Sequence, residues 1–349
     1  MTKPVLDALH GRETLRHPVW FFRQAGRYLP EFQTIRADTD FLSVCRSPAK
    51  AAEVTIQPLR RFDLDAAIIF SDILFPLSVT GQQLTYTAGR GPVLTPAIRS
   101  EADFAILKVP QFLFGLECVG EAIERVRSRL HPHQAMIGFA GAPFTVASYM
   151  VEGEGSRHYT EIKRMAFRNP QLLTRILDFL VQLTIDYVEI QLKAGAEVIV
   201  LFDSWAGNLS PLDYKLWALP HLQRVVQGIR QHGVPVVYYP GSNSEVLLQL
   251  GGLDVQAVAV DWRTSLRHAA RLLQEAGQPC HLQGNLDPQI LMGDQDLIRS
   301  RVRQILDEHV LLHPRRHIFN VGHGLLPHIP VQGVEWAVEA VRQWQAPGL

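Results

Sequence analysis

Residues 194–207 read Ala-Gly-Ala-Glu-Val-Ile-Val-Leu-Phe-Asp-Ser-Trp-Ala-Gly, and no other stretch says more about the fold. The run Glu197–Phe202 is mostly apolar and does not alternate with polar residues, which is typical of a strand buried on both faces. A segment with helical spacing, Asn169–Ala194, precedes it and is followed by Gly195, the usual residue just past a helix end. The stretch therefore predicts a helix, a tight turn and a buried parallel strand in succession.

The same kind of apolar run recurs along the chain, separated by segments with helical periodicity. There are eight such runs: Pro18–Phe22, Ala66–Phe70, Ala135–Phe139, Glu197–Phe202, Val234–Tyr239, Ala257–Val260, Pro279–Leu282 and His317–Val321. The predicted helices are Ala102–Leu130, Asn169–Ala194, Leu212–His232, Ser244–Gly251, Ser265–Ala276, Asp294–His309 and Val334–Trp344. Eight strands alternating with helices predict an α/β fold, a closed (β/α)8 TIM-type barrel. A doubly wound nucleotide-binding sheet would carry a Gly-x-Gly-x-x-Gly turn, and the chain has none.

Length and composition are consistent with one large domain. The chain has 349 residues without a linker or internal repeat, so we expect a single barrel domain over residues 1–349, with residues 1–16 as an N-terminal extension. Lys and Arg total 34, as do Asp and Glu, and this zero net charge argues against a nucleic-acid partner. The apolar stretch Met136–Val151 is too short to span a membrane. Three widely spaced cysteines suit a reducing compartment, and we expect a cytoplasmic protein.

Polar residues follow most of the predicted strands, where a (β/α)8 barrel places its active site. Glycine accompanies most of them, which suits a rim where the backbone must approach a ligand closely. The candidates are, in chain order, Arg23, Arg27, Asp72, Tyr149, Ser204 and His323. The two nearby arginines favour a substrate that carries carboxylate or phosphate groups.

Most of these residues also have a purely structural interpretation. Asp72 alone would be expected to cap the following helix, and backbone groups could satisfy the Tyr149 hydroxyl. Asp203 and Asp261 are expected to support the rim or cap helices. His323 stands between two glycines, which a solvent-exposed turn does not require. The convergence of the whole set at one end of the barrel is what favours a functional site.

Motifs of several common chemistries are missing from the sequence. It contains no HExxH, no Gly-x-Ser-x-Gly and no Cys/His cluster at metal-ligand spacing. It also contains no cofactor-binding motif, so we expect neither a metal nor an organic cofactor. The substrate itself is then expected to act as the electron sink of the reaction.

Two long motifs of the sequence are Pro18-Val-Trp-Phe-Phe-Arg-Gln-Ala-Gly-Arg-Tyr-Leu-Pro-Glu31 and Gly138-Phe-Ala-Gly-Ala-Pro-Phe-Thr-Val-Ala-Ser-Tyr-Met-Val-Glu-Gly153. Both resemble the signatures of the uroporphyrinogen decarboxylase family. Shorter motifs match in the family's order, namely Phe70–Leu74, Phe202–Gly207, Gln283–Pro288 and Asn320–Gly324. The resemblance runs from roughly residue 17 to residue 345. It implies a cofactor-free, single-domain (β/α)8 barrel that usually forms a homodimer.

The resemblance implies a carboxy-lyase of haem and chlorophyll biosynthesis. Members of the family remove the four acetate carboxyl groups of uroporphyrinogen III as CO₂ and release coproporphyrinogen III. Protonation of a pyrrole carbon makes the ring a cationic electron sink, and a fixed anion beneath the ring stabilises that cation. The expected partner is the small-molecule substrate, with no nucleic acid and no membrane.

The resemblance also implies roles for individual residues. Arg23 and Arg27 match arginines that meet substrate carboxylates, and Asp72 matches the aspartate that accepts hydrogen bonds from the pyrrole N–H groups. Tyr149 and His323 complete the catalytic set. The implied substrate-binding residues are Arg23, Gln24, Ala25, Gly26, Arg27, Asp72, Tyr149, Phe202, Ser204 and His323. The general acid is Arg23 or Asp72, and the sequence leaves both open.

The chain departs from the family pattern at a few positions. Phe22 stands where methionine is more usual, and residues 239–244 lack the lysine of a Lys-Gly-Gly-type turn. Residues 330–334 replace the usual Pro-Glu-Asn/His-Val run. These changes concern loops and the dimer surface, and none falls on a residue of the catalytic set.

Two other functions fit parts of the pattern. Related barrels are zinc-dependent methyltransferases that carry a His-x-Cys pair before Gly-Asn. This chain has His281-Leu-Gln283 at that place, and glutamine is not a usual zinc ligand. The other alternative is a catalytically inactive tetrapyrrole-binding protein, although a pure binder has no need of the complete catalytic set.

Overall fold

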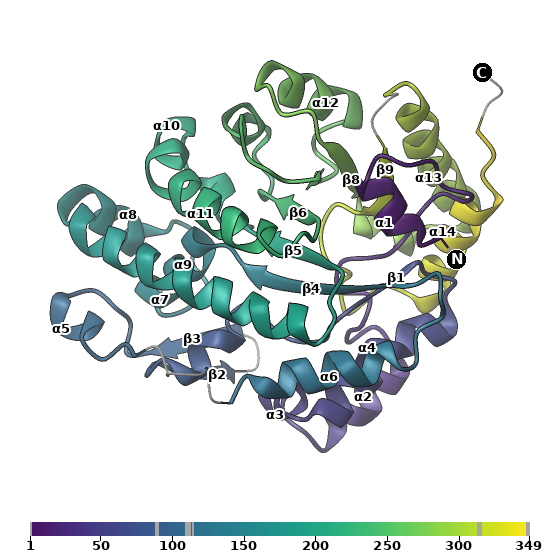
Figure 1. Ribbon diagram of the computed structural model, residues 1–349. Helices are drawn as coiled ribbons and strands as arrows, with labels where there is room; N and C mark the ends of the chain where they lie inside the picture. The colour runs from purple at the N-terminus through teal and green to yellow at the C-terminus, as the bar shows by residue number, and fades with distance from the viewer. Residues whose placement is uncertain (1, 88–90, 109–112, 114, 313–315, 347–349) are drawn as a thin grey trace.

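The computed structural model describes residues 2–87, 91–108, 113, 115–312 and 316–346. Its centre is a curled, all-parallel sheet of seven strands with helices packed around it (Figure 1). In sheet order the strands are β1 (Ala66–Ile68), β4 (Ala135–Gly141), β5 (Val198–Phe202), β6 (Val236–Tyr239), β7 (Ala257–Ala259), β8 (His281–Leu286) and β9 (His317–Val321). Sheet order follows chain order, as expected when a helical connection returns each strand beside the previous one.

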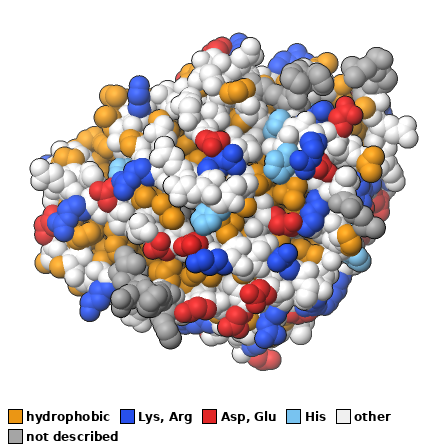
Figure 2. Space-filling view, in the orientation of Figure 1, with side chains coloured by type: hydrophobic (Ala, Val, Ile, Leu, Met, Phe, Trp, Pro, Cys, Tyr) orange, Lys and Arg blue, Asp and Glu red, His pale blue; other side chains and the backbone are white. Residues whose placement is uncertain are grey.

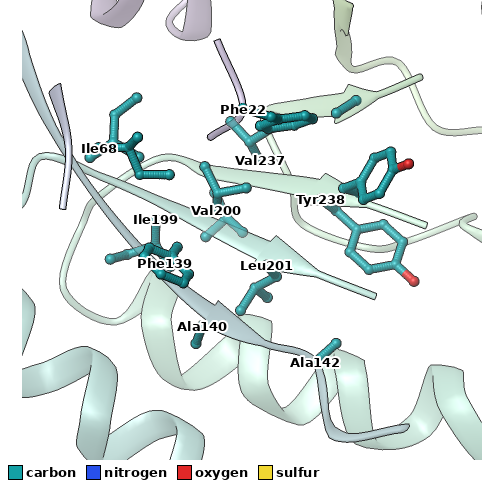
Figure 3. Packing of buried hydrophobic residues seen from close by; sticks show 14 of the residues in the cluster. Phe22, Ile68, Phe139, Ala140, Ala142, Ile199, Val200, Leu201, Val237 and Tyr238 are labelled. Carbon is teal, nitrogen blue, oxygen red and sulfur yellow. The ribbon is translucent and has the colours of Figure 1, made fainter. Parts of the chain in front are cut away.

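The strands are buried because both of their faces carry apolar side chains. Every residue of β4 and of β6 is buried. Side chains from β4, β5 and β6 pack together in the core, among them Phe139, Val200, Leu201 and Val237 (Figure 3). This confirms the prediction of parallel, doubly buried strands that the non-alternating runs gave.

The first predicted strand, Pro18–Phe22, forms only a single bridge. Val19 pairs with Phe319 of β9 in the parallel sense, and the Trp20 N–H donates to the Phe319 carbonyl at 3.3 Å. On its other side, the Asp65 N–H donates to the Val19 carbonyl at 2.9 Å, just before β1. The segment therefore lies between β9 and β1. A turn begins at residue 22, so the extended part is short, and the described part of this sheet has seven strands instead of the predicted eight.

Helices form the outer layer of the molecule. They are α1 (Pro4–Leu9), α2 (Pro30–Ala37), α3 (Phe41–Arg46), α4 (Pro48–Arg61), α5 (Glu101–Phe104), α6 (Glu117–Arg127), α7 (Pro143–Glu152), α8 (Thr160–Arg168), α9 (Pro170–Lys193), α10 (Pro211–Asp213), α11 (Leu219–Arg230), α12 (Leu266–Glu275), α13 (Gln295–Val310) and α14 (Val331–Gln343). Short 3₁₀ segments are η1 (Phe75–Val79), η2 (Ala206–Asn208), η4 (Ser244–Gln249) and η5 (Pro288–Met292), and η3 (Tyr214–Ala218) is a π-helical turn. Within the described ranges, no helix has the length and apolar character needed to cross a membrane. Acidic and basic side chains are interspersed on the face shown in Figure 2.

Several predicted helices are confirmed, and others differ. The predictions at 169–194, 265–276, 294–309 and 334–344 correspond to α9, α12, α13 and α14. The predicted helix at 212–232 is divided by the π turn, and the one at 244–251 is a 3₁₀ segment. The predicted helix at 102–130 is two helices, α5 and α6, and its residues 109–112 and 114 lie outside the described residues. The antiparallel hairpin of β2 (Gln83–Thr87) and β3 (Gly91–Thr95) was not predicted.

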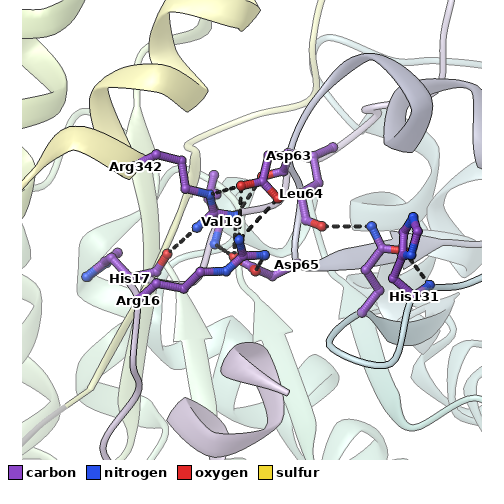
Figure 4. Close-up of polar contacts among 9 residues, drawn as sticks. Arg16, His17, Val19, Asp63, Leu64, Asp65, His131 and Arg342 are labelled. Carbon is purple, nitrogen blue, oxygen red and sulfur yellow. Dashed lines mark hydrogen bonds and ion pairs between the residues drawn. The ribbon is translucent and has the colours of Figure 1, made fainter. Parts of the chain in front are cut away.

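The buried carboxylate of Asp65 joins the Val19 segment, which lies between β9 and β1, to residues near both ends of the chain (Figure 4). The Asp65 side chain is fully buried and accepts from the Val19 N–H and from Arg342, each at 2.8 Å. It also accepts from Arg16 at 2.5 Å. Asp63 is half exposed and pairs with the same two arginines, at 3.0 Å from Arg16 and 2.9 Å from Arg342. Because Arg342 belongs to α14, this cluster joins the N-terminal segment, the start of β1 and the last helix.

Three histidines pack together at the amino ends of the strands. The rings of His17, His309 and His317 lie with their centroids 5.2 Å apart in each pair. His317 Nε2 is 2.7 Å from the Gly284 carbonyl, which can only accept, so this nitrogen carries the ring proton. His317 Nδ1 then accepts from His17 Nε2 at 3.0 Å. Burial, and after it the neighbouring histidines, hold the pKa of His17 and of His317 well below the ordinary value.

We expect acid to destabilise the fold through these two histidines. The folded state resists their protonation, whereas in the unfolded chain a histidine has a pKa of about 6.5. Stability therefore falls as the pH drops below about 6.5, by up to about 1.4 kcal/mol per pH unit for each histidine. Denaturant midpoints between pH 7.5 and pH 5.5 measure this slope. His317→Gln should make it shallower and His10→Gln, at an exposed histidine, should not. The same slope in all three proteins would contradict the expectation.

Candidate active site

The carboxyl ends of the parallel strands meet at one edge of the sheet, and the predicted site residues follow them. Ser204 comes two residues after β5, and His323 two residues after β9. Asp72 follows β1 after a short loop, and Tyr149 lies in α7, the helix after β4. Arg23 lies in the turn that follows the Val19 segment, which pairs with β9. The fold thus places residues from five separate parts of the chain at this edge.

The Arg23 turn is held in an unusual conformation. Arg23 has a φ of 55°, in the left-handed region that residues with side chains rarely adopt. A Cβ on Gly324 would come within 2.4 Å of the Arg23 Cδ, so glycine makes room for the arginine side chain. Gln24 is fully buried, and its amide accepts from the Phe21 N–H at 3.1 Å and donates to the Ala66 carbonyl at 2.9 Å. Gln24 therefore anchors the turn to β1, and its contact with substrate stays a prediction.

Asp72 is enclosed by protein and held at one oxygen. Its Oδ1 accepts from the Leu74 N–H at 2.8 Å, within the turn that precedes η1. The expectation that Asp72 caps the following helix was wrong, because Leu74 is the N-cap of η1 and no side chain caps it. Part of its surface is exposed, yet the surrounding protein is dense enough that burial raises the pKa of the carboxyl. The Leu74 N–H, the Tyr86 hydroxyl and the charge of Arg23 act in the opposite direction and lower that pKa.

Tyr149 is held by stacking. Its ring lies against that of Trp205, with centroids 3.6 Å apart and an interplanar angle of 29°. Tyr159 contacts the same indole edge-on, at 5.0 Å. Burial raises the pKa of Tyr149, the charge of Asp72 raises it further, and Arg23 opposes them. Tyr149 therefore keeps its O–H at neutral pH and can donate a hydrogen bond.

His323 is neutral at the same edge. Its side chain is half-buried, and Nδ1 lies 3.4 Å from the Gly324 carbonyl. Burial and the charge of Arg23 lower the pKa of His323. Arg23 also acts on the pKa of Asp72 and of Tyr149, so the other three side chains all lie within range of the charge of Arg23.

Aromatic side chains form an apolar group around the end of β5. Phe202 contacts Phe22 at 5.1 Å, Phe139 at 5.7 Å and Tyr239 at 6.2 Å between ring centroids. Phe22, the departure from the family pattern, thus keeps an apolar packing role. Ser204 follows this group and is half-buried.

The rest of the first motif is less constrained. Arg27 is exposed, and its backbone carbonyl accepts from the Gln33 side chain at 2.8 Å. Ala25 and Gly26 are half-buried. A role for these three residues in substrate binding stays a prediction.

The two aspartates expected to support the rim are buried and hydrogen-bonded. Asp203 accepts from the Thr145 hydroxyl at 2.7 Å and from the Tyr238 hydroxyl at 2.9 Å, and burial raises its pKa to about 6. Asp261 accepts from the backbone N–H of Arg263 at 3.0 Å and pairs with its guanidinium. Both carboxylates are thus committed to neighbouring protein groups.

Tyr86 of β2 was missed by the sequence analysis. Its hydroxyl is buried and makes no hydrogen bond of good geometry with the described residues. Burial and the nearby charge of Asp72 raise the pKa of this hydroxyl. Its ring packs on Phe41 at 4.6 Å. The alternation of Gln83-Leu-Thr-Tyr-Thr87 was the available signal, since it is typical of a strand with one buried face.

Two cavities lie away from this edge. A cavity of about 300 Å³ is lined by residues including Arg60, His131 and His133, and another of about 390 Å³ surrounds His17 and His317. Neither is lined by a predicted site residue. Across the described ranges, no group of three or more His, Cys, Asp or Glu side chains is arranged to hold a metal ion.

Sequence comparison identifies the family. The pattern of the family described as "Uroporphyrinogen decarboxylase (URO-D)" matches residues 1–344. Proteins named uroporphyrinogen decarboxylase from Syntrophotalea carbinolica and Myxococcus xanthus are each 42% identical to this chain. The matches cover 97% and 98% of this chain, and 96% and 97% of those proteins. The chain belongs to the uroporphyrinogen decarboxylase family. This confirms the resemblance drawn from the motifs and places the chain in a family of carboxy-lyases.

The fold of this chain also resembles the folds of solved structures. A methyltransferase from Methanosarcina mazei has a TM-score of 0.80 at 19% identity, over 97% of both chains. A B12-independent methionine synthase from Shewanella has a TM-score of 0.56 at 11% identity, over 84% of this chain and 85% of its own. At these identities the likeness concerns the fold alone. The Gln283 side chain, which we do not expect to bind zinc, accepts from the Trp20 indole N–H at 3.1 Å.

Proposed function

We propose that the protein removes the four acetate carboxyl groups of uroporphyrinogen III and releases coproporphyrinogen III, in tetrapyrrole biosynthesis. Family membership over nearly the whole chain supports this reaction. The observation that carries the proposal is the setting of Asp72. The Asp72 carboxyl is enclosed at the carboxyl ends of the strands, and the nearby charge of Arg23 acts on its pKa. Part of the surface of Asp72 remains open to a ligand.

The reaction needs a place for the electron pair of the breaking bond. Protonation of a pyrrole carbon makes the ring cationic, and the bond from the acetate methylene to its carboxylate then breaks. CO₂ leaves, and the bonding pair moves into the ring. The methylene carbon takes up a proton and the ring returns the first one, so the net exchange is one proton for one CO₂. An ionised Asp72 beside the ring would stabilise the cation without reorganisation during the reaction.

The general acid is Asp72 or Arg23, and the pKa argument favours Asp72. Arginine has a pKa above about 12, so it gives up a proton reluctantly. Burial raises the pKa of the Asp72 carboxyl, which makes its protonated form more available than that of an exposed aspartate. After donating its proton, Asp72 is left as the anion that stabilises the cation.

The other predicted residues would bind and orient the substrate. Arg23 and Arg27 are suited to carboxylates because a guanidinium donates two parallel hydrogen bonds. Tyr149 is a protonated hydroxyl and His323 a neutral imidazole, so both can donate a hydrogen bond without adding charge. Phe202 offers an apolar surface to the macrocycle, with Gln24, Ala25, Gly26 and Ser204 completing the proposed binding set.

An anaerobic incubation with chemically reduced uroporphyrinogen III tests the proposal. The products are oxidised and separated by carboxyl number, with and without EDTA. We expect a series from eight carboxyls to four that EDTA does not change. Bound tetrapyrrole without loss of carboxyls would favour the binding-protein alternative, and loss of activity in EDTA would favour a metal-dependent reaction.

We further propose that the chain is a single-domain, closed (β/α)8 barrel that works in the cytoplasm as a homodimer. The backbone hydrogen bonds of the Val19 segment to β9 and to Asp65 support closure. The free thiols of Cys45 and Cys118 are compatible with a reducing compartment. The dimer rests on the family resemblance, and sedimentation at micromolar concentration tests it.

A further inference from the structure

Asp203 links the buried interior to the proposed active site. It is 1% exposed and stands between Phe202 and Ser204, both in the proposed binding set. Its two oxygens accept from two hydroxyls on different elements, Thr145 of α7 at Oδ1 and Tyr238 of β6 at Oδ2. A hydroxyl has a single proton, so each hydroxyl that donates to Asp203 can act only as an acceptor toward its other neighbours.

The orientation of the Thr145 hydroxyl lets its oxygen hold the backbone of Trp205. With its proton directed at Asp203, the Thr145 oxygen accepts from the Trp205 backbone N–H at 3.1 Å. The Trp205 ring is the one that stacks on Tyr149 at 3.6 Å. An unbroken series of contacts therefore runs from the buried carboxylate to a side chain of the catalytic set.

The Tyr238 hydroxyl leads away from the active site. It gives its proton to Asp203, so it accepts from the Tyr214 hydroxyl, 3.0 Å away. Tyr214 and Tyr238 are both fully buried. The same carboxylate thus holds one hydroxyl that supports the catalytic set and one that supports only the core.

We propose that Asp203 is a positioning residue for the decarboxylation, which holds the stacked Tyr149–Trp205 pair in place through the hydroxyl of Thr145. The meaning of this role for catalysis rests on the proposed function. The contacts themselves do not, so the two can be tested separately.

The test compares Thr145→Val with Tyr238→Phe, because each removes one hydroxyl donor to the same carboxylate with little change in volume. We expect Thr145→Val to lower kcat by about 10- to 100-fold, since small misplacements of catalytic groups have effects of this size. It should also change the emission of Trp205, measured as the difference from the same protein carrying Trp205→Phe. Tyr238→Phe should leave both at wild-type values, and Thr145→Ser should restore them. Thr145→Ala replaces Thr145→Val if that variant does not fold.

Two results would overturn the positioning role. One is the same kcat in the folded Thr145→Val and Tyr238→Phe proteins, and the other is unchanged Trp205 emission in Thr145→Val. Absence of turnover in the wild-type protein would instead overturn the proposed function. The emission comparison would then still decide whether Thr145 holds Trp205.

Discussion

Asp72→Asn is expected to lower the rate of decarboxylation by about 100- to 1,000-fold, the usual cost of losing one preorganised electrostatic group. An asparagine can keep the shape of the site, because its side-chain oxygen can accept from the Leu74 N–H as Oδ1 of Asp72 does at 2.8 Å. What disappears is the negative charge and the capacity to donate a proton. The measurement is single-turnover loss of carboxyl groups under anaerobic conditions.

The same substitution should not destabilise the fold. Burial raises the pKa of Asp72, so the folded state disfavours its ionised form relative to the unfolded chain. At a pH above both pKa values this penalty is fully present, and the neutral asparagine removes it. Thermal unfolding at pH 7.5 should therefore give an equal or higher midpoint. Asp38→Asn, at an exposed aspartate, is the control and should change neither rate nor midpoint. Near-normal turnover in folded Asp72→Asn would refute the role of Asp72.

The parallel sheet could be predicted where a strand is apolar throughout, as in the run Glu197–Phe202 that contains β5. Prediction was weaker for β8, where only its first two residues lay in a predicted run. Two of its polar side chains, Gln283 and Asn285, are buried and have hydrogen-bond partners elsewhere in the chain. Gln283 accepts from Trp20, and Asn285 donates to the Asp261 carbonyl at 3.1 Å. Such partners lie far away in sequence, so local patterning does not reveal them.

In the candidate site, too, local sequence was enough to predict some residues and not others. Residues that come soon after a strand, such as Ser204 after β5, could be found because the end of a strand is a local property of the sequence. The parts played by Thr145 and Trp205 could not, because their hydrogen bond joins residues 60 positions apart. The closeness of Tyr86 to Asp72 depends on the β2–β3 hairpin, whose place against η1, α3 and α7 is likewise set by tertiary packing.

Asp65→Ala is expected to lower the free energy of unfolding by about 3–5 kcal/mol, the usual cost of breaking a buried ion pair from one side. The Asp65 carboxylate is fully buried and accepts from Arg16, from Arg342 and from the Val19 N–H. Its removal leaves two guanidinium groups without their buried partner and a backbone N–H without an acceptor. The lost interactions hold the Val19 segment between β9 and β1. We therefore expect the sheet to lose stability first at this seam, the junction of β9, the Val19 segment and β1.

Asp63→Ala provides a matched control because Asp63 pairs with the same two arginines, at 3.0 Å and 2.9 Å. The Asp63 side chain is 52% exposed, against 0% for Asp65. An exposed ion pair contributes only about 0–1 kcal/mol, so Asp63→Ala should shift the urea midpoint little. Amide hydrogen exchange should show the largest loss of protection in β9 and β1 for Asp65→Ala alone. If the two variants lowered stability equally, burial of the carboxylate would not be what holds this seam together.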